Sequence, residues 1–337
     1  MSDVIGESSI ENTPRCIIII PCLNEKDHIG PLLDSLDADL EALDCNVIVA
    51  DGGSTDGTQA IVQARALGEP RIRLMHNARR IQSAAVNAAV SAFGDGIDYL
   101  IRIDAHGDYP NNYCQHLVEE ALQTDADSVV VSMLTKGRGL FQRAVAEAQN
   151  SRLGTGGSAH RVGSSGRWVD HGHHALMRVA AFRAVGGYDE TFSHNEDAEL
   201  DMRLRKAGFR IWMTDKTRMV YYPRARVGAL FHQYLGYGRG RAKNLLKHRN
   251  IPRPRQAVPL LVAPAVALAL LAPIHWIFAV PFVVWAGVCM LWGLLSGLRQ
   301  RRGESYLSGV PAMVMHLAWS TGFWLQLAGV QKHRGAV

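Results

Sequence analysis

The sequence predicts an α/β protein in which a doubly wound, mostly parallel sheet is followed by a C-terminal helical segment embedded in a membrane. Two observations support this prediction. From residue 14 onward, short apolar runs rich in β-branched residues alternate with helical patterns, which is typical of parallel sheets. Near the C-terminus, residues 257–298 contain no Asp, Glu, Lys or Arg. A chain of 337 residues is long enough for about two domains of ordinary size.

The predicted strands and helices follow one another in order. The first strand, residues 16–20, reads CIIII, a continuous apolar run that suits a strand buried on both faces. An apolar stripe at Ile29, Leu32, Leu33 and Leu36 predicts the first helix. Further strands are expected at 46–50, 72–75, 99–103 and 128–133, and further helices at about 59–67, 81–93, 113–123 and 198–207.

The composition excludes several classes of protein. Hydrophobic residues make up 47% of the chain, and the 32 glycines and 13 prolines follow no fixed period, which excludes collagen-like and disordered chains. The five cysteines are scattered and form no CxxC pair, so neither a disulfide framework nor a thiolate zinc cluster is expected. This use of cysteine predicts that the protein lies in the reducing cytosol. Residues 1–13 are predicted to be a polar tail without a signal peptide.

Positive charge is concentrated in one segment. Eleven Lys and Arg and no Asp or Glu lie between Lys216 and Gln256, whereas the whole chain carries only +5. Such a stretch attracts polyanions, whether nucleic acid, anionic lipid headgroups or a diphosphate. The uncharged stretch that follows favours a membrane, so no nucleic acid partner is expected. Residues 231–256 are predicted to form a basic amphipathic segment at the membrane surface.

The uncharged stretch 257–298 is predicted to cross the membrane twice. As one helix it would be roughly 60 Å long, about twice the hydrocarbon thickness. The neighbourhood of Pro273 is a plausible turn, because Pro ends a helix. Residues 305–331 are also long enough to span, which leaves two or three crossings open within 257–331, before a tail at 332–337.

The positive-inside rule orients the chain. Arginines at positions 253 and 255 precede the first expected crossing, and arginines at 299, 301 and 302 follow the second. The rule places both groups on the cytoplasmic side. The large N-terminal domain, predicted at residues 14–230, would therefore face the cytoplasm.

Polar residues follow three of the predicted strands. Asn24 and Glu25 follow the first strand, Asp51 the second and Asp104 the fourth. In doubly wound sheets, ligands bind at the carboxyl ends of the strands. Asp51 opens the segment DGGSTDGT and is expected to have a free carboxylate that accepts from a ribose hydroxyl or a uracil N–H. The alternative is that Asp51 to Thr58 is an ordinary turn.

Asp104 and His106 form a candidate metal site. They are separated by one residue after a strand, and an oxygen with an imidazole suits Mn better than an all-oxygen Mg site. Two ligands cannot hold a metal alone, so a nucleotide diphosphate would have to complete the site. The alternative is a turn with a surface histidine. The trio His171, His173 and His174 is not expected to bind zinc, but one of them is expected to line the acceptor pocket.

Two further candidates lie near the C-terminal half of the predicted domain. Asp197, in the sequence HNED before a helix, could act as general base on a sugar hydroxyl, or could simply cap the helix. Arg239 and Arg241, among small residues, could close on a diphosphate. For Arg241, Lys243 and Lys247, contact with anionic lipid is an equal alternative.

Taken together, these motifs resemble the family 2 glycosyltransferases of the GT-A fold. The shared motifs, in family order and spacing, are PCLNE at 21–25, DGGSTDGT at 51–58, DAH at 104–106, GGYDE at 186–190 and NED at 195–197. The resemblance covers about residues 14–245. More narrowly, RIDAHGDYP, QNSRLGTGG and YGRGRAK resemble bacterial glucosyltransferases of succinoglycan biosynthesis.

The resemblance implies an inverting hexosyltransferase that uses a nucleotide sugar, UDP-glucose, and a divalent metal, Mn or Mg. It implies that Pro21, Asn24, Glu25 and Asp51 line the nucleotide pocket. It also implies that Asp104 binds ribose and metal, and that Asp197 is the base. The family commonly has a second Asp where this chain has His106, which leaves the metal open.

The membrane segment favours a lipid-linked acceptor. The expected acceptor is an undecaprenyl-diphosphate-linked saccharide of exopolysaccharide assembly, with other assembly enzymes as further candidate partners. Two alternatives stay open: a membrane-anchored nucleotide-sugar-binding protein without transfer activity, and a family 2 transferase with another donor or acceptor. A dehydrogenase is disfavoured because the sequence has no GxGxxG.

Overall fold

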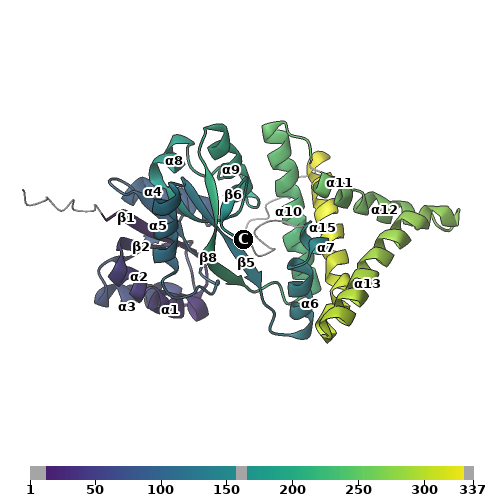
Figure 1. The fold of residues 1–337 in the computed structure, drawn as a ribbon, viewed down its shortest axis with the longest axis horizontal. Helices are drawn as coiled ribbons and strands as arrows, with labels where there is room; N and C mark the ends of the chain where they lie inside the picture. Colours follow the sequence, from purple (N-terminus) through teal and green to yellow (C-terminus); the bar gives the residue numbers. More distant parts are fainter. Residues whose placement is uncertain (1–12, 157–164, 253, 330–337) are drawn as a thin grey trace, which may run out of the picture.

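An eight-stranded sheet lies at the centre of the N-terminal part of the chain (Figure 1). This computed structural model describes residues 13–156, 165–252 and 254–329, so residues 1–12 of the expected tail 1–13, and all of the expected tail 332–337, lie outside the described residues. The strands are β1 (Arg15–Cys22), β2 (Asp44–Asp51), β3 (Ile72–His76), β4 (Tyr99–Arg102), β5 (Ser128–Thr135), β6 (Arg167–Val169), β7 (His173–Arg178) and β8 (Ile211–Tyr221).

The helices surround the sheet and continue beyond it. Those of the N-terminal part are α1 (Lys26–Ser35), α2 (Asp37–Ala42), α3 (Thr58–Gly68), α4 (Gln82–Phe93), α5 (Tyr113–Thr124), α6 (Leu140–Gln149), α7 (Arg152–Thr155), α8 (Val179–Ala184) and α9 (Glu196–Lys206). Those that follow are α10 (Val227–His248), α11 (Pro254–Leu260), α12 (Val262–Ala269), the 3-10 turn η2 (Trp276–Ala279), α13 (Val280–Gln300), α14 (Gly303–Leu307) and α15 (Gly309–Leu327).

The sheet is mostly parallel, as the sequence predicts. Its strand order is β3-β2-β1-β4-β7-β5-β8-β6. Strands β1 to β5 and β8 run in one direction, and β7 and β6 run in the other. The antiparallel strand β7 joins the two parallel halves of the sheet. The carboxyl ends of β1, β2, β4 and β5 therefore lie at the same edge, where the polar residues were expected to meet.

The apolar strand β1 is buried on both faces of the sheet. Ile18 and Ile20 point into one core, together with residues of α1, α2 and α5. Ile17 and Ile19 point into a second core, against α4, α8 and α9. Successive strand residues face opposite sides, so helices on both faces require apolar residues at every position of the strand.

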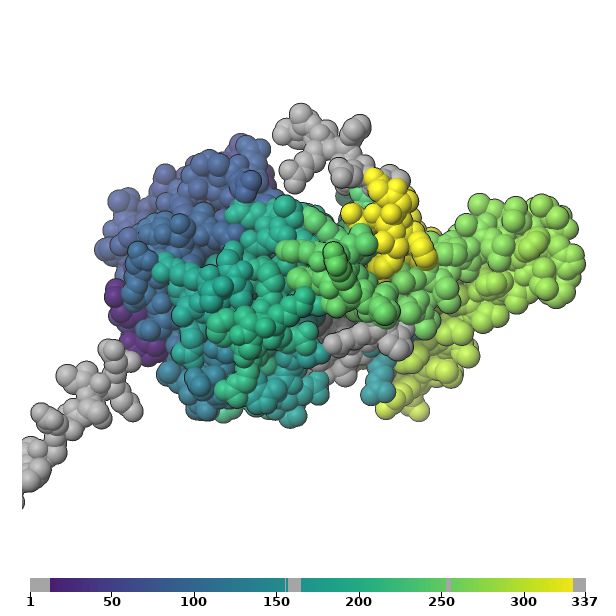
Figure 2. Space-filling model, turned by 90° about the horizontal axis from the view of Figure 1, so that it is seen from above, coloured from purple at the N-terminus to yellow at the C-terminus, as the bar shows by residue number. Residues whose placement is uncertain are grey.

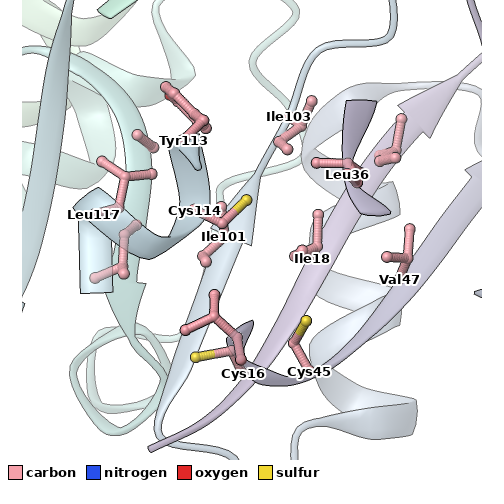
Figure 3. Close-up of a cluster of buried hydrophobic side chains, with 14 of the residues drawn as sticks. Cys16, Ile18, Leu36, Cys45, Val47, Ile101, Ile103, Tyr113, Cys114 and Leu117 are labelled. Atoms are coloured by element: carbon pink, nitrogen blue, oxygen red, sulfur yellow. The ribbon is translucent and has the colours of Figure 1, made fainter. Parts of the chain in front are cut away.

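The five cysteines are all buried and none is bonded to another. Figure 3 shows three of them, Cys16, Cys45 and Cys114, packed with Ile18 and Ile101 in the first core. Burial raises the pKa of the Cys16 and Cys45 thiols to about 12, so both remain protonated at neutral pH. These thiols act as small apolar side chains in the core.

Helices α10 and α15 pack closely together at small residues. A Cβ atom added at Gly238 in α10 would lie 2.0 Å from the carbonyl oxygen of Trp319. One added at Gly322 in α15 would lie 2.1 Å from the carbonyl oxygen of Leu235. Only glycine allows the two backbones to come this close. Within 305–331, considered as a possible third crossing, residues 309–327 thus form the helix α15, which packs closely against α10.

Helices α11 to α13 form a hairpin that projects away from the rest of the molecule (Figures 1 and 2). In the described part of the chain, one helical stretch, Trp276–Gln300, is long and apolar enough to cross a membrane, with a mean hydropathy of 2.1. The first half of the hairpin has a shorter apolar helix, Gln256–Ala269.

This first half differs from the expected full crossing. At 1.5 Å per residue it reaches only about 21 Å, less than the hydrocarbon core of roughly 30 Å. Pro259 and Pro264 interrupt helical hydrogen bonding within it. The prediction of two crossings was based on the length of the uncharged stretch and on its lack of charge. Neither property shows where the prolines end the first helix.

Candidate active site

A cavity of about 1490 Å³ opens at the carboxyl edge of the sheet and extends to the hairpin. Of the candidate site residues that the sequence singled out, eight line this cavity. They are Pro21, Glu25, Asp104, His106, His171, His173, Asp197 and Arg241. Asp104 follows β4, whereas Asp197 lies in the first turn of α9. The fold thus brings residues far apart in the sequence to one cleft.

Asp197 is held by a buried arginine. Arg102 of β4 is 3% exposed, and its Nη1 and Nη2 donate to Oδ1 and Oδ2 of Asp197 at 2.6 and 3.2 Å. Tyr188 donates its hydroxyl to Oδ1 at 3.2 Å. Burial opposes ionisation, but the charges of Arg102 and His174 outweigh it and hold the pKa of Asp197 far below its usual range. The carboxylate is therefore charged and fixed in one orientation.

Behind Asp197 lies a chain of polar groups. His174 is fully buried, with Nδ1 at 3.3 Å from Asp197 and Nε2 at 2.7 Å from Oδ1 of Asp201. Asp201 also pairs with His171 through Nδ1 at 2.6 Å. Burial disfavours a charged His174, yet the carboxylates of Asp201 and Asp197 raise its pKa. The fully buried Asp201 thus connects two histidines of this network.

Glu196 differs from its neighbour Asp197. Its Oε2 is buried and has no hydrogen-bond partner among the described residues, and the side chain lines the cavity. Burial and the nearby charge of Asp197 raise the pKa of Glu196 to about 7. At neutral pH the first turn of α9 therefore presents one charged carboxylate and one carboxyl group that is only partly ionised to the same cleft.

The candidate metal residues lie at the other side of the cleft. Asp104 accepts a hydrogen bond from Gln82 at 3.0 Å and lies 3.6 Å from Nε2 of His173. His106 lies 3.1 Å from Glu25 through Nδ1, and this contact raises the pKa of His106. Among the described residues, no group of three or more His, Cys, Asp or Glu is placed to hold a metal ion. Any ion at Asp104 and His106 would thus need ligands from a substrate.

Asp51 does not have the free carboxylate that was expected. It is 1% exposed, and its oxygens accept hydrogen bonds from the backbone of Gly53 and Ser54, the Ser54 hydroxyl and Gln59. The carboxylate is not among the groups that line the cavity. In a turn of this kind the backbone N–H groups need an acceptor, and Asp51 supplies it. The turn alternative describes this residue better.

Asn24 connects the first two loops of this edge. Its Oδ1 accepts from the backbone N–H of Thr55 at 2.9 Å, and its own N–H donates to Ser54 at 2.7 Å. It adopts a left-handed backbone with φ of 56°, which Asn tolerates better than most residues. Asn24 therefore shapes the loop beside the cavity without lining it.

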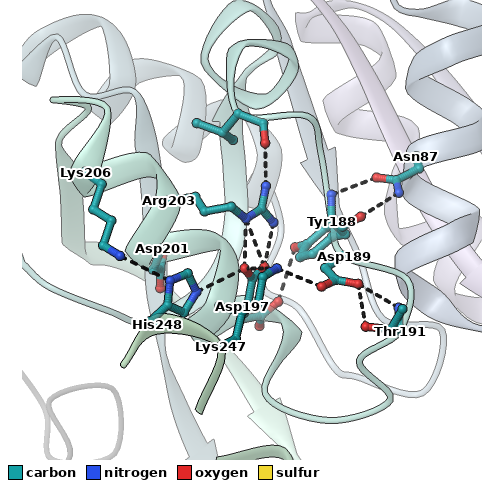
Figure 4. Close-up of polar contacts among 12 residues, drawn as sticks. Asn87, Tyr188, Asp189, Thr191, Asp197, Asp201, Arg203, Lys206, Lys247 and His248 are labelled. Carbon is teal, nitrogen blue, oxygen red and sulfur yellow. Dashed lines mark hydrogen bonds and ion pairs between the residues drawn. The ribbon is translucent and has the colours of Figure 1, made fainter. Parts of the chain in front are cut away.

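The basic helix α10 binds the catalytic part more than expected. Lys243 donates to the backbone oxygen of Thr191 at 2.6 Å. Lys247 bridges Asp189 and the buried Glu199, at 2.7 and 2.6 Å (Figure 4). These two ammonium groups are thus engaged within the protein. Arg241 faces the cavity, whereas Arg239, two residues earlier on the helix, is not among the lining residues.

Sequence reasoning missed Arg102 and Glu196. A signal for Arg102 was present, because a charged residue inside the apolar strand IRI must have a buried partner. For Glu196 the sequence offers no such signal. Which of two adjacent acids is paired depends on the position of β4 relative to α9.

The chain is similar to known proteins. The chain matches the profile of Glycosyl transferase family 2 over residues 17–186, and that of Glycosyl transferase family group 2 over residues 104–327. It is 61% identical over 311 residues to the succinoglycan biosynthesis protein ExoA of Rhizobium meliloti (strain 1021), covering 92% of this chain and 94% of that protein.

The chain is also similar to more distant proteins. The chain is 29% identical over 256 residues to N-acetylglucosaminyl-diphospho-decaprenol L-rhamnosyltransferase of Mycobacterium tuberculosis (strain H37Rv), covering 66% of this chain and 77% of that enzyme. Its fold is similar to that of a solved mannosyltransferase from Pyrobaculum calidifontis, with a TM-score of 0.57 at 19% identity over 95% of this chain and 89% of the other. The chain therefore belongs to glycosyl transferase family 2 and is a glycosyltransferase with the GT-A fold.

Proposed function

We propose that this enzyme transfers a hexose, glucose from UDP-glucose, onto a lipid-diphosphate-linked saccharide in the assembly of a succinoglycan-like exopolysaccharide. The observation that carries the proposal is the cavity, which joins the acidic cleft at Asp104 and Asp197 to an apolar hairpin. The close relative is a succinoglycan biosynthesis protein, and a more distant one acts on a diphospho-decaprenol acceptor. A family 2 transferase with another donor or acceptor is the alternative.

The proposed reaction proceeds in one step with inversion, giving a β-linkage. Asp197 accepts the proton of the acceptor hydroxyl. At the same time the oxygen of that hydroxyl attacks C1 of the donor sugar, from the face opposite the departing UDP. Arg102 fixes the orientation of this carboxylate. Arg80, Arg224 and Arg241 also line the cavity and supply positive charge for two diphosphate groups.

A divalent metal, Mn or Mg, fits the donor side of the proposed site only together with the substrate. Asp104 and His106 offer an oxygen and an imidazole ligand, with the diphosphate of the donor as the third. When bound, the ion would neutralise the charge on the leaving diphosphate. The structurally similar mannosyltransferase was solved with GDP-Man and Mn2+.

The proposed enzyme works at the cytoplasmic face of the bacterial inner membrane. We assign residues 14–230 to the catalytic domain, 231–256 to the segment at the membrane surface and 257–331 to the membrane region. The apolar stretch Trp276–Gln300 and the arginines on both sides of the hairpin support this orientation. Other enzymes of polysaccharide assembly would supply the acceptor and extend the product.

The test compares wild-type membranes with an Asp197→Asn variant, given labelled UDP-sugars and lipid-diphosphate-linked acceptors. Loss of a general base costs about 10²–10⁴-fold in rate, so transfer should fall by that factor while UDP-sugar binding remains. Asp201→Asn is the control, because Asp201 lies on the same helix but is fully buried and does not line the cavity. It should keep much more activity.

Two results would contradict parts of the proposal. Equal transfer by Asp197→Asn and wild type would reject Asp197 as the base. No transfer by wild type from any UDP-hexose to any lipid-diphosphate-linked saccharide would reject the proposed donor and acceptor. A panel of nucleotide sugars screened by thermal shift would then identify the donor.

A further inference from the structure

We infer that the apolar half of the cavity binds the isoprenoid chain of the acceptor, and that the chain enters it from the side of the hairpin. This apolar half, called here the hairpin groove, is lined by Val262, Ala265, Val284, Trp285, Val288 and Trp319. The inference rests on the proposed function, because it assumes a lipid-linked acceptor. It adds the place in the molecule where the lipid is held.

The first argument is that one cavity has a charged part and an apolar part. At the sheet edge the lining is charged, with Glu25, Asp104 and Asp197, whereas α12 and α13 contribute no charged residue. A ligand that fills both parts must have a charged or hydroxylated end and an apolar end. A saccharide joined through a diphosphate to a hydrocarbon chain has this division, and a water-soluble oligosaccharide does not.

The second argument is that the hairpin groove is held at a fixed position on the catalytic part. Pro264 has no N–H, so the carbonyl of Leu260 loses its normal helical donor. Ser320 and Trp324 of α15 donate to this oxygen instead, at 2.9 and 2.8 Å. The break between α11 and α12 is therefore anchored to α15.

The other wall of the groove is also anchored. Trp285 of α13 donates its Nε1–H to His316 of α15 at 3.4 Å, and the other ring nitrogen of His316 lies 2.9 Å from the carbonyl oxygen of Leu153. Helix α15 in turn contacts α10, which carries Arg241 into the cavity. The distance between the groove and the acidic cleft is thus set by packed helices.

The third argument is the exposure of the hairpin. The outward side chains of its tip, Leu270, Ile274 and Trp276, are 70 to 77% exposed. Only 11% of the apolar window of Trp276–Gln300 is buried inside the protein. A surface of this kind is stable only in a membrane or against a partner. With the hairpin in the bilayer, the groove opens where a membrane lipid can enter.

The test uses two adjacent valines of α13. Val283 and Val284 are both 59% exposed, but only Val284 lines the cavity. Val284→Trp narrows the groove, and Val283→Trp adds the same bulk on the membrane side. Each variant is assayed with one saccharide diphosphate carried on a long isoprenoid chain and on a ten-carbon chain.

Val284→Trp should lower kcat/KM for the long-chain acceptor, relative to the ten-carbon acceptor, by about tenfold or more, because the indole would exclude several CH₂ groups of the long chain from the groove. Val283→Trp should leave this ratio at the wild-type value. Val288→Trp, one turn further along the groove, provides a second narrowing variant if Val284→Trp does not fold.

An unchanged ratio in the narrowing variants, or an equal fall in Val283→Trp, would overturn the inference. Equal use of long and ten-carbon acceptors by wild type would do the same and would leave the proposed transfer intact. A wild type that uses neither acceptor would instead reject the proposed function. A spin-labelled phospholipid can be used to detect binding in the groove. If unlabelled phospholipid displaces it and the isoprenoid-linked acceptor does not, the occupant is an ordinary membrane lipid.

Discussion

Two adjacent carboxyl groups at the start of α9 have opposite electrostatic environments. Asp197 is paired with a buried arginine and two histidines, whereas one oxygen of Glu196 is buried without a partner in the described structure. As a result, the pKa of Asp197 is lowered and that of Glu196 is raised to about 7. Asp197 remains charged over the physiological range, so Glu196 is the member of this pair that titrates near neutral pH.

Glu196→Gln should make the protein more stable at pH 8 and change little at pH 5. In the folded protein Glu196 has a pKa of about 7, against 4.5 for the ordinary group. The folded state therefore keeps a proton that the unfolded state has released, and wild type loses stability as the pH rises through 7. The variant has no such loss.

Melting temperatures measured between pH 5 and 8 test this prediction. Glu119→Gln, at an exposed site on α5, is the control for loss of one acidic group. Parallel curves of melting temperature against pH for wild type and Glu196→Gln would mean that Glu196 is already ionised in the folded protein. The charged groups that surround Glu196 are Asp104, Asp197 and Arg102.

His106→Asp should change the metal preference of the enzyme from Mn toward Mg. The substitution replaces an imidazole by an oxygen ligand, and Mg prefers oxygen. The ratio of activities with Mn and with Mg, after removal of metal by a chelator, is the measurement. His28→Asp is the matched control, because His28 also contacts Glu25, at 2.9 Å, but does not line the cavity. The same ratio in His106→Asp and wild type would exclude His106 as a ligand.

At the scale of residues, the sequence predicts which positions approach the cleft better than it predicts what they do. Asp104 and Asp197 were placed correctly because each follows or precedes a recognisable element. Asp51 was also placed at a strand end, but the number of backbone donors around its carboxylate depends on the turn. The pairing of Arg102 with Asp197 depends on a long-range contact, which periodicity does not contain.

Among the elements, α10 connects α15, which supports the hairpin, to the acidic cleft. It packs on α15 through Gly238, and it passes close to the loop before α9 at Gly240, where an added Cβ would lie 2.3 Å from the carbonyl oxygen of His194. Displacement of α10 would therefore disturb both the hairpin support and the residues that precede Glu196.

Gly238→Ala should lower the free energy of unfolding by about 1–3 kcal/mol, because the new methyl group collides with backbone and forces α10 and α15 apart. Gly228→Ala is the matched control on the same helix, since nothing lies within 4 Å of its added Cβ. Alanine also has a higher helix propensity than glycine, so Gly228→Ala should raise the free energy of unfolding by about 0.5–1 kcal/mol. Denaturation in detergent solution compares the two. Equal stability of both variants would show that the helices can separate without cost.

The elements of the first half of the chain could be predicted, and several of the second half could not. Strands β1 to β5 are apolar runs bounded by polar turns, and their expected positions agree with the structure. Strands β6 to β8 were missed because they are short or polar. The strand β7 begins with His173 and His174, and β8 contains the buried Thr214 and Thr217 and the exposed Asp215 and Lys216. Their partners lie across the sheet, so their strand character depends on the tertiary structure.

At the scale of the whole molecule, the proposed membrane location depends on the exposed apolar hairpin. Replacing Leu270, Ile274 and Trp276 together by Asp should release the protein from membranes into the soluble fraction at alkaline pH, because charged residues are costly in hydrocarbon. Leu67→Asp is the control, since Leu67 is 89% exposed on α3, far along the chain from the hairpin. Fractionation of membranes by sedimentation is the measurement. Retention of the triple variant in the membrane pellet would mean that another surface anchors the protein.

The burial of all five cysteines has a practical consequence for experiments on this enzyme. A water-soluble maleimide reacts only with thiols that solvent reaches, so labelling of the native protein should be slow at every cysteine. Cys16, Cys45 and Cys114 would react when the sheet opens, whereas Cys289 would react when α13 leaves α15. Peptide mapping after timed labelling would therefore follow the opening of two regions separately, with no engineered probe.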